Sequence, residues 1–187
     1  MKKIILASAL ALGSAYGGAA LAKSPQAPFT LSSSDFKPGQ SVAHKHVFNG
    51  FGCTGENLSP ALSWKNAPKG TKSFTLTVYD PDAPTGSGWW HWVVYNIPAN
   101  ATSLPASIGQ GANLPAGAIQ GLNDFSTNHY GGPCPPKGAQ AHRYIVTLNA
   151  LSVEKLDLPT NASPALVGFM SNANSLGKAT LTVKYGR

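Results

Sequence analysis

Residues Leu76–Pro98 read LTVYDPDAPTGSGWWHWVVYNIP, and this stretch gives the clearest indication of the fold. Two apolar runs, the first of which begins just before this stretch, enclose a short segment that is rich in Gly, Pro and Asp. The first run, Phe74–Val78, alternates apolar residues with threonines, which is the period-two pattern of a half-buried β-strand. The second run, Trp90–Ile97, is apolar on both faces, as in a central strand that is covered on two sides.

The rest of the chain predicts a mainly β, loop-rich fold. It has 20 Gly and 15 Pro among 187 residues, short apolar runs, and neither repeats nor heptads. One helix is expected to begin near Ser163, with Pro164 at its first position, and to end at about Asn174. The segment Asn100–Gln140 is rich in Gly, Pro and Asn, and loops of this length are usually functional or disordered. Further strands are expected at Gln40–Phe48, Arg143–Leu151 and Lys178–Tyr185.

Residues 1–22 are predicted to be a signal peptide. The basic pair Lys2 and Lys3 precedes an apolar stretch that ends in the small-x-small cleavage signal Ala20-Leu21-Ala22. An uncleaved anchor is the alternative, although the glycines and the cleavage signal in this stretch disfavour it. Residues 23–187 then form a single exported domain, periplasmic or released, of about 165 residues. No later segment approaches the roughly 20 apolar residues of a membrane span.

Export would determine the oxidation state of the two cysteines. Cys53 and Cys134 are the only cysteines of the chain, and in an oxidising compartment one disulfide is the expected state. It would close a loop of about 80 residues, worth on the order of 4 kcal/mol in the chain-entropy model. A catalytic thiol is the alternative, but neither Cys is adjacent to a His in the sequence.

The charge pattern argues against nucleic-acid binding. Without Lys2 and Lys3 the chain has 12 basic and 7 acidic side chains, a formal net charge of +5. Its lysines are scattered singly and form no basic run interleaved with aromatic residues. The mild positive charge is compatible with anionic ligands or envelope surfaces.

Three predicted strands each have a polar side chain at one end of an inward-facing apolar row. Asp80 ends the inward-facing row of the first strand. His142 begins the row that continues with Tyr144, and His91 begins the row that continues with Val93. If these three ends meet, they form a polar floor in an apolar mouth, which is the usual composition of a small-molecule site.

These residue types suit a zwitterionic or phosphate-bearing ligand. Imidazolium and backbone N–H groups donate to phosphate oxygens, and a carboxylate orients a His or accepts from a ligand ammonium. Because a bare carboxylate repels a phosphate dianion, at least one of Asp80 and Asp82 is expected to be protonated or hydrogen-bonded to His. Pro81 and Pro84 restrict the backbone around both acids.

Each of these signals also has a structural explanation. The segment Asp80–Pro84 fits a turn with an Asp cap, and a single buried His is often a satisfied core residue. His44 and His46 would share a face of their predicted strand, but a metal site there lacks a third ligand. His129 either lines the mouth of the pocket or is solvated. Core and rim packing accounts for Trp89, Trp90 and Trp92.

Four segments together resemble a known family. The chain is similar to the phosphatidylethanolamine-binding protein (PEBP) family, and in particular to the exported YbcL-type members of its bacterial Raf-kinase-inhibitor-like branch. The resemblance covers essentially the whole chain after the signal peptide. It implies a large central antiparallel sheet packed against a smaller sheet, with peripheral helices. The matching segments are Leu76–Pro98, NDFSTNHYGGPCPPKGAQAHRYIVTLNAL (123–151), GENLSPALSW (55–64) and the C-terminal GKATLTVKYGR.

The resemblance also implies an anion pocket at one end of the sheet, for phosphate, acetate or a phosphorylated headgroup. Trp90 replaces a second His of the eukaryotic pattern, so a more apolar mouth is expected. Gln140 replaces a Gly of many relatives and is expected to narrow or reshape the entrance. Cys134 falls within the pocket loop, where a bridge to Cys53 would rigidify the wall. The ligand-binding residues carried over are Asp80, Asp82, Pro84, His91, Tyr130, Pro133, Pro135, His142 and Tyr144.

The expected function is binding without a cofactor or a metal ion. The alternative is a modulator of a protease or host protein, since relatives act through protein contacts. The kinase inhibition in the branch name is not carried over, because an exported bacterial protein does not normally meet cytosolic kinases. A third hypothesis is a hydrolase that uses His142 and Asp80 as acid and base. The sequence shows neither a nucleophile elbow nor a metal triad to support it.

Overall fold

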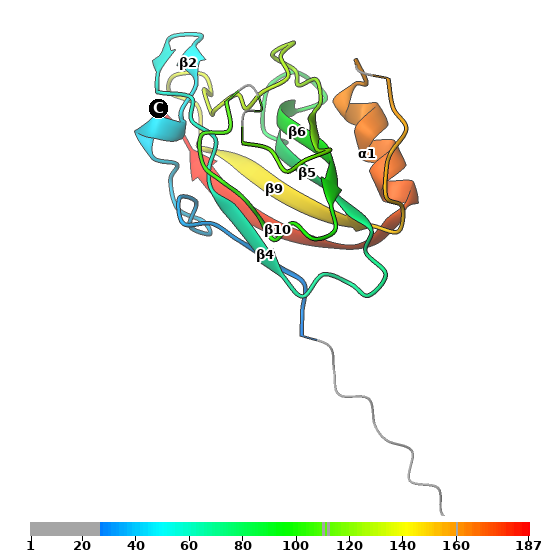
Figure 1. Cartoon of the computed structure of the whole chain (residues 1–187). Helices are drawn as coiled ribbons and strands as arrows, with labels where there is room; N and C mark the ends of the chain where they lie inside the picture. Colours follow the sequence, from blue (N-terminus) through cyan, green and yellow to red (C-terminus); the bar gives the residue numbers. More distant parts are fainter. Residues whose placement is uncertain (1–26, 110, 112, 160) are drawn as a thin grey trace, which may run out of the picture.

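The computed structural model describes residues 27–187 except 110, 112 and 160. The predicted signal peptide, 1–22, lies outside these residues. The described chain is mainly β, as predicted, with one α-helix and one 3₁₀ helix (Figure 1). The elements are β1 (Thr30–Ser32), η1 (His44–His46), β2 (Asn49–Gly50), β3 (Cys53–Thr54), β4 (Leu62–Lys65), β5 (Ser73–Asp80), β6 (Trp89–Pro98), β7 (Ser103–Leu104), β8 (Ile119–Gln120), β9 (His142–Leu151), α1 (Pro164–Ala173) and β10 (Ser175–Tyr185).

All three sheets of the described residues are antiparallel. The large sheet has the strand order β10-β9-β5-β6-β8, the smaller one has the order β1-β4-β7, and β2 pairs with β3. The predicted alternation is confirmed in β10, where Ala179, Leu181 and Val183 are buried and the residues between them are more exposed. Strand β5 is central, and six of its eight residues are buried; the two half-buried ones are Thr77 and Tyr79.

The main core lies between the two larger sheets. Leu62, Trp64 and Leu104 of the small sheet pack with Leu76 and Leu148 of the large sheet. Helix α1 covers part of the other face of the large sheet, where it contacts β6 and β9 (Figure 1). The large sheet is therefore covered on both faces, which explains why β6 is mostly apolar and buried from His91 to Ile97.

Helix α1 begins and ends where the sequence predicts. Its N-cap is Ser163, whose hydroxyl accepts a hydrogen bond from the Leu166 N–H, and Pro164 occupies the first helical position. Val167 is buried against Val93 and Tyr95 of β6. The resemblance implied several peripheral helices, but α1 is the single α-helix within the described ranges.

The prediction of a strand over Gln40–Phe48 is wrong. Only a short stretch pairs with β10, through Val42 N–H to Lys184 O (2.9 Å) and a bridge between Ser41 and Lys184. The chain then turns into the 3₁₀ helix η1, which buries His46 and leaves His44 exposed. The two imidazoles therefore do not share a strand face.

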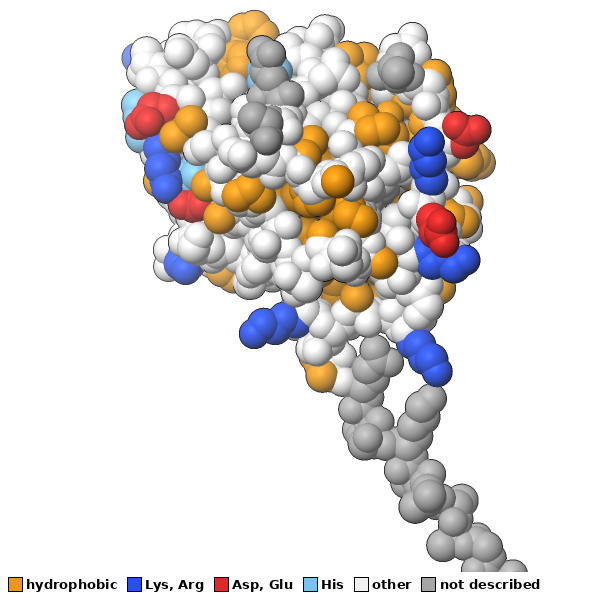
Figure 2. Space-filling view, in the orientation of Figure 1, with side chains coloured by type: hydrophobic (Ala, Val, Ile, Leu, Met, Phe, Trp, Pro, Cys, Tyr) orange, Lys and Arg blue, Asp and Glu red, His pale blue; other side chains and the backbone are white. Residues whose placement is uncertain are grey.

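The segment Asn100–Gln140 is long but carries two short strands. Strand β7 extends the small sheet next to β4, and β8 adds an edge to the large sheet next to β6. On the face that Figure 2 shows, the Lys and Arg side chains are scattered around the periphery. None of the helices in the described part of the chain is long and apolar enough to cross a membrane.

Candidate functional site

A small cavity lies where β5 ends and β6 and β9 begin. Antiparallel pairing brings these three strand ends to one edge of the large sheet, so residues far apart in sequence become neighbours. The cavity volume is about 190 Å³. Its lining residues are Phe51, Asp80, Ala83, Pro84, Thr85, Trp89, His91, Phe125, Cys134, Pro135, Pro136, His142 and Tyr144.

Asp80 and His142 form a buried pair on the cavity wall. Asp80 is 2% exposed and His142 6%, and the ring Nδ1 lies 2.7 Å from Asp80 Oδ2. The other carboxylate oxygen, Oδ1, accepts the Asp82 backbone N–H at 2.8 Å. A carboxylate in this position accepts a hydrogen bond from the Nδ1–H group, so it fixes the ring and directs its Nε2 away from Asp80.

His91 reaches the cavity because β6 is irregular at this point. The register places Trp90 opposite Tyr79 but Trp92 opposite Val78, so His91 is the extra residue of a β-bulge. The predicted row from His91 through Val93 is therefore wrong, since Val93 lies on the opposite face against α1. The bulge places His91 with Asp80 and Tyr144.

The ring of His91 is held from two sides. Its Nδ1 lies 2.7 Å from Gly131 O, and the backbone N–H of Gly131 donates to His91 O at 2.9 Å. The rings of Phe125 and Tyr144 contact it edge-on at centroid distances of 5.4 and 5.1 Å. Burial in these surroundings lowers the pKa of His91 to about 4.

Two hydrogen-bond donors of the lining are buried without a protein partner in the described part of the chain. They are the hydroxyl of Tyr144 and the indole N–H of Trp89. Burial and the nearby carboxylate of Asp80 both raise the pKa of Tyr144, so its hydroxyl keeps its proton at neutral pH. Buried polar groups of this kind normally have a partner in the working protein.

Two glycines allow the loop that forms one wall to approach closely. A Cβ at Gly131 would lie 2.4 Å from a ring carbon of Phe125, and one at Gly132 would lie 2.2 Å from His46 O. The Gly132 N–H also donates to Asn57 Oδ1 at 2.7 Å. The two glycines of the GGPCPP segment are thus required by space, and they hold Phe125 against the cavity.

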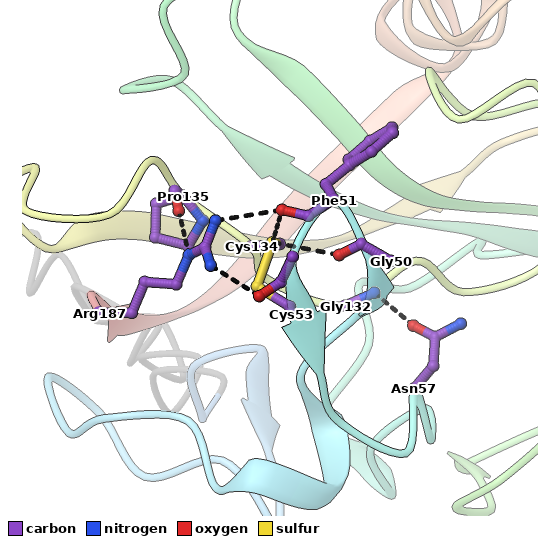
Figure 3. The surroundings of a disulfide bond; sticks show 9 residues. Gly50, Phe51, Cys53, Asn57, Gly132, Cys134, Pro135 and Arg187 are labelled. Carbon is purple, nitrogen blue, oxygen red and sulfur yellow. Dashed lines mark hydrogen bonds between the residues drawn. A yellow bond between two sulfur atoms is a disulfide. The ribbon is translucent and has the colours of Figure 1, made fainter.

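The predicted disulfide is confirmed, and it joins two walls of the cavity. Cys53 and Cys134 are bonded with a Cα–Cα distance of 6.0 Å (Figure 3). The guanidinium of Arg187 reinforces the same junction, since it donates to Pro135 O (2.7 Å), Gly52 O (2.9 Å) and Phe51 O (3.2 Å). This junction positions Phe51, whose side chain is 70% exposed at the rim.

Three of the residues carried over from the family do not line the cavity. Asp82 points away from it and forms a two-pronged ion pair with Arg143, from Nε to Oδ2 (2.9 Å) and from Nη2 to Oδ1 (2.6 Å). Tyr130 is buried behind the wall and donates to His46 O at 3.0 Å. Pro133 O accepts the Phe48 N–H at 3.1 Å. All three position the walls, whereas the other six carried-over residues line the cavity.

Other expected rim residues lie elsewhere. Trp90 packs on Tyr79 at 4.4 Å between ring centroids, and Trp89 lines the cavity in its place. Gln140 borders a neighbouring hollow with Arg143 and does not narrow the cavity. His129 borders a separate small cavity of about 60 Å³.

Sequence reasoning missed the aromatic rim and the asparagines that hold it. Phe51 and Phe125 line the cavity, but an isolated Phe in a loop gives no local signal. Asn123 Oδ1 accepts the Phe125 and Thr127 N–H groups, both at 3.0 Å, and its Nδ2 donates to His91 O at 3.2 Å. The string NDFST, with Asn two residues before Phe, is typical of such a turn and was a usable signal.

Similar proteins fit this description. A family model described as phosphatidylethanolamine-binding protein matches residues 32–186. The UPF0098 protein YbcL of Escherichia coli K12 is 53% identical over 161 residues, which cover 85% of this chain and 88% of that protein. The UPF0098 protein YbhB of the same organism is 49% identical over 156 residues, which cover 83% and 98%. The crystal structure of E. coli YbcL, described as a member of the mammalian PEBP family, matches with a TM-score of 0.84 and 52% identity, covering 86% of this chain and 99% of that one.

Proposed function

This chain belongs to the phosphatidylethanolamine-binding protein family, and from that premise we propose that it is an exported binding protein for a small anion or a phosphorylated headgroup. The ligand enters the cavity between β5, β6 and β9. Its anionic oxygens take hydrogen bonds from the wall, and its remainder contacts the aromatic rim. The protein acts by holding this ligand and not by converting it.

The observation that carries this proposal is the pair of buried donors without a protein partner. The Tyr144 hydroxyl and the Trp89 indole N–H belong to side chains that line the cavity. Leaving a buried donor unpaired costs about 1–3 kcal/mol, and an oxyanion in the cavity would relieve this cost. The Asp80–His142 pair adds a third group, because the carboxylate holds the imidazole ring through Nδ1 and leaves Nε2 for the ligand.

The size of the cavity supports a headgroup over a whole lipid. About 190 Å³ is below the range of roughly 300–1,000 Å³ found for pockets that enclose drug-sized ligands. A phosphate group with a short substituent suits such a volume. The apolar side chains of Phe51, Phe125 and Pro135 at the wall and rim exclude water, which strengthens each hydrogen bond inside.

Binding accounts for the polar groups better than catalysis does. The cavity holds a carboxylate–imidazole pair, as hydrolases do, but a nucleophile beside it is also required. Thr85 supplies the one aliphatic hydroxyl of the lining, and it already donates to Gly88 O. Among the described residues no cluster of three or more His, Cys, Asp or Glu side chains suits a metal ion.

The test is an NMR titration with inorganic phosphate and O-phosphorylethanolamine. The imidazole signals of His91 and His142 should shift saturably, while those of the exposed His44 stay unchanged. His142→Ala should lose the binding and keep its fold, whereas His44→Ala should bind like the wild type. Unchanged affinity in His142→Ala would exclude this cavity as the site.

The catalytic alternative has its own test. Phosphate monoesters, phosphate diesters and acyl esters should remain intact during incubation with the protein at millimolar concentration. Turnover that disappears in His142→Ala would replace the binding proposal with a hydrolase in which His142 and Asp80 act as acid and base.

A further inference from the structure

Helix α1 presents large apolar side chains at the surface. Its inner side is buried against the large sheet through Val167, and the helix lies at the edge of the molecule (Figure 1). On its outer side Leu166 is 38% exposed and Phe169 is 68% exposed, and Leu176, just after the helix, is 41% exposed. Three of the five exposed large hydrophobic side chains in the described part of the chain therefore belong to this short segment.

The same segment carries no charge. Residues 158–177 contain no Asp, Glu, Lys, Arg or His, whereas a helix at the surface normally has charged side chains opposite its buried stripe. Lys178 lies at the border of this face, where its Nζ donates to Asn172 Oδ1 at 2.7 Å. An apolar centre without charge, bounded by polar groups, is the usual composition of a protein–protein interface.

The surface beside Phe169 forms a shallow socket of small residues. Ala165, Gly168 and Asn172 follow the spacing i, i+3 and i+7, so together with Phe169 they outline one four-residue hole on the helix surface. A Cβ at Gly168 would meet no atom within 4 Å, so the space above it is open. Gly is unfavourable in a helix interior, and no neighbour in the described ranges requires it here. Gly168 therefore keeps the socket open for a group from outside.

The socket and the protruding Phe169 make this face self-complementary. In paired helices a side chain of one helix inserts as a knob into a four-residue hole of the other. A two-fold axis would place each Phe169 over Gly168 of the second copy, so that one surface serves both partners. Because the chain has a net positive charge, two copies repel each other least where their surfaces carry no charge.

A lipid surface fits this face less well than a second copy does. Helices that lie on membranes are typically rich in Lys and Arg on their polar side, which draws them to anionic lipids. Helix α1, Pro164–Ala173, has no basic residue at all.

We infer that α1 is the contact surface of a weak dimer of this chain, in which Phe169 of each copy packs on Gly168 of the other. The ten-residue helix is about 15 Å long, so the area that it buries falls short of the roughly 800 Å² per partner of a standard interface. The dissociation constant is therefore expected in the micromolar to millimolar range.

This pairing leaves the candidate binding cavity open. Asn149, near the end of β9, donates to Ser171 O of α1 at 3.2 Å, whereas His142 at the beginning of β9 lines the cavity. The helix therefore lies toward the end of β9 that is remote from the cavity. Each dimer carries two accessible cavities, and self-association should not depend on anion binding.

Sedimentation equilibrium of the chain from Lys23 to Arg187 tests the dimer. The average mass should rise from that of the monomer toward that of the dimer as the concentration approaches the millimolar range. Phe169→Asp should raise the dissociation constant about tenfold or more, because a carboxylate replaces the aromatic ring at the centre of the contact. Phe51→Asp, the same change at a comparably exposed Phe outside α1, should keep the wild-type constant.

A second variant separates specific packing from general hydrophobic association. Gly168→Leu makes the face more apolar but fills the socket. Non-specific association would therefore become stronger, whereas the proposed dimer should weaken by about tenfold or more. The variant should fold at least as stably as the wild type, because the space above Gly168 is open and Leu is a better helix former than Gly.

The contrary results are distinct from a failure of the proposed function. A monomer at every concentration up to millimolar would overturn the dimer, and so would association that persists in Phe169→Asp or increases in Gly168→Leu. If the wild type stays monomeric but binds phosphatidylcholine vesicles, and Phe169→Asp does not, the face belongs to a lipid surface instead. The titration of His142 with phosphate tests the cavity separately from all of these.

Discussion

Two aspartates that lie two residues apart in the sequence have different roles in the structure. Asp80 lies inside the cavity, where it holds His142. Asp82 lies outside it, where both of its oxygens are taken by the side chain and backbone N–H of Arg143. The hydrogen bond from the Arg143 side chain, and the charge that it carries, hold the pKa of Asp82 at about 2. Asp82 thereby joins the turn after β5 to the start of β9.

Replacement of Asp82 should therefore affect stability more than binding. We expect Asp82→Asn to lower the free energy of unfolding by about 0.5–1 kcal/mol, since the pair is half-exposed and screened by solvent. Affinity for O-phosphorylethanolamine should change less than twofold. Urea unfolding and calorimetry on the same sample measure both. A large loss of affinity with unchanged stability would make Asp82 a ligand group after all.

His91 makes stability depend on pH in a defined window. Its pKa is about 4 in the folded protein because of burial, against 6.5 for an exposed imidazole. The unfolded chain therefore binds more protons between these values, and stability falls as the pH is lowered through them. The full effect amounts to about 3 kcal/mol. The corresponding window for Asp82 lies lower, between 3.8 and about 2.

Urea unfolding at several pH values checks this prediction. The wild-type protein should lose stability between about pH 6.5 and pH 4, and His91→Gln should show a flatter profile there because Gln does not titrate. His44→Gln, a change at an exposed site, should follow the wild type. Equal slopes for His91→Gln and the wild type would show that His91 is not the group that binds the proton.

At the scale of elements, regular strands could be predicted from the sequence, but the β-bulge in β6 and the 3₁₀ helix η1 could not. The alternation in β10 and the cap of α1 are local patterns, and both are confirmed. The bulge in β6 depends on how Tyr79 and Val78 pair with it, which no residue of β6 encodes alone. Likewise η1 replaces the predicted strand because the chain leaves the edge of β10 after Val42.

The same distinction holds for the cavity. Asp80 and His142 could be predicted because each continues a regular row of its strand to a common edge. His91 was predicted as well, but from a row that the bulge interrupts. Phe51 and Phe125 were not predicted, since their place depends on loops that the disulfide and Asn123 hold together; the string NDFST predicts the turn at Phe125 but not its place in the cavity.

The disulfide should contribute more to stability than any single hydrogen bond at its junction. Replacing both Cys53 and Cys134 with Ser should lower the free energy of unfolding by up to about 4 kcal/mol, because the unfolded chain gains the entropy of a long open loop. Arg187→Met removes three hydrogen bonds from the same junction and should cost about 1–3 kcal/mol. Urea unfolding compares the two variants, and equal losses would contradict the entropic account.

At the scale of the whole molecule, the antiparallel topology explains why the candidate binding residues lie together at one end of the large sheet. Strands β5, β6 and β9 are neighbours, so the end of the first and the beginnings of the others meet at one edge. One face of the large sheet is covered by α1, where Val167 packs against Val93 and Tyr95 of β6 and Asn149 of β9 donates to Ser171 O. The family resemblance predicted this layered fold because its motifs lie on these three strands and on β4 and β10, so they include strands of both larger sheets.

If the protein is exported, removal of the signal peptide and formation of the disulfide should occur together. We expect the protein isolated from the bacterial envelope to begin at Lys23 and to contain no free thiol, since cleavage after Ala22 and oxidation of Cys53 and Cys134 both follow export. A chain expressed from Lys23 in a reducing cytoplasm should contain two free thiols. Intact mass and thiol counting on denatured, unreduced protein measure both states. Full-length chain in the membrane fraction would instead indicate an uncleaved anchor. Free thiols in the envelope protein would show that export does not lead to formation of the disulfide.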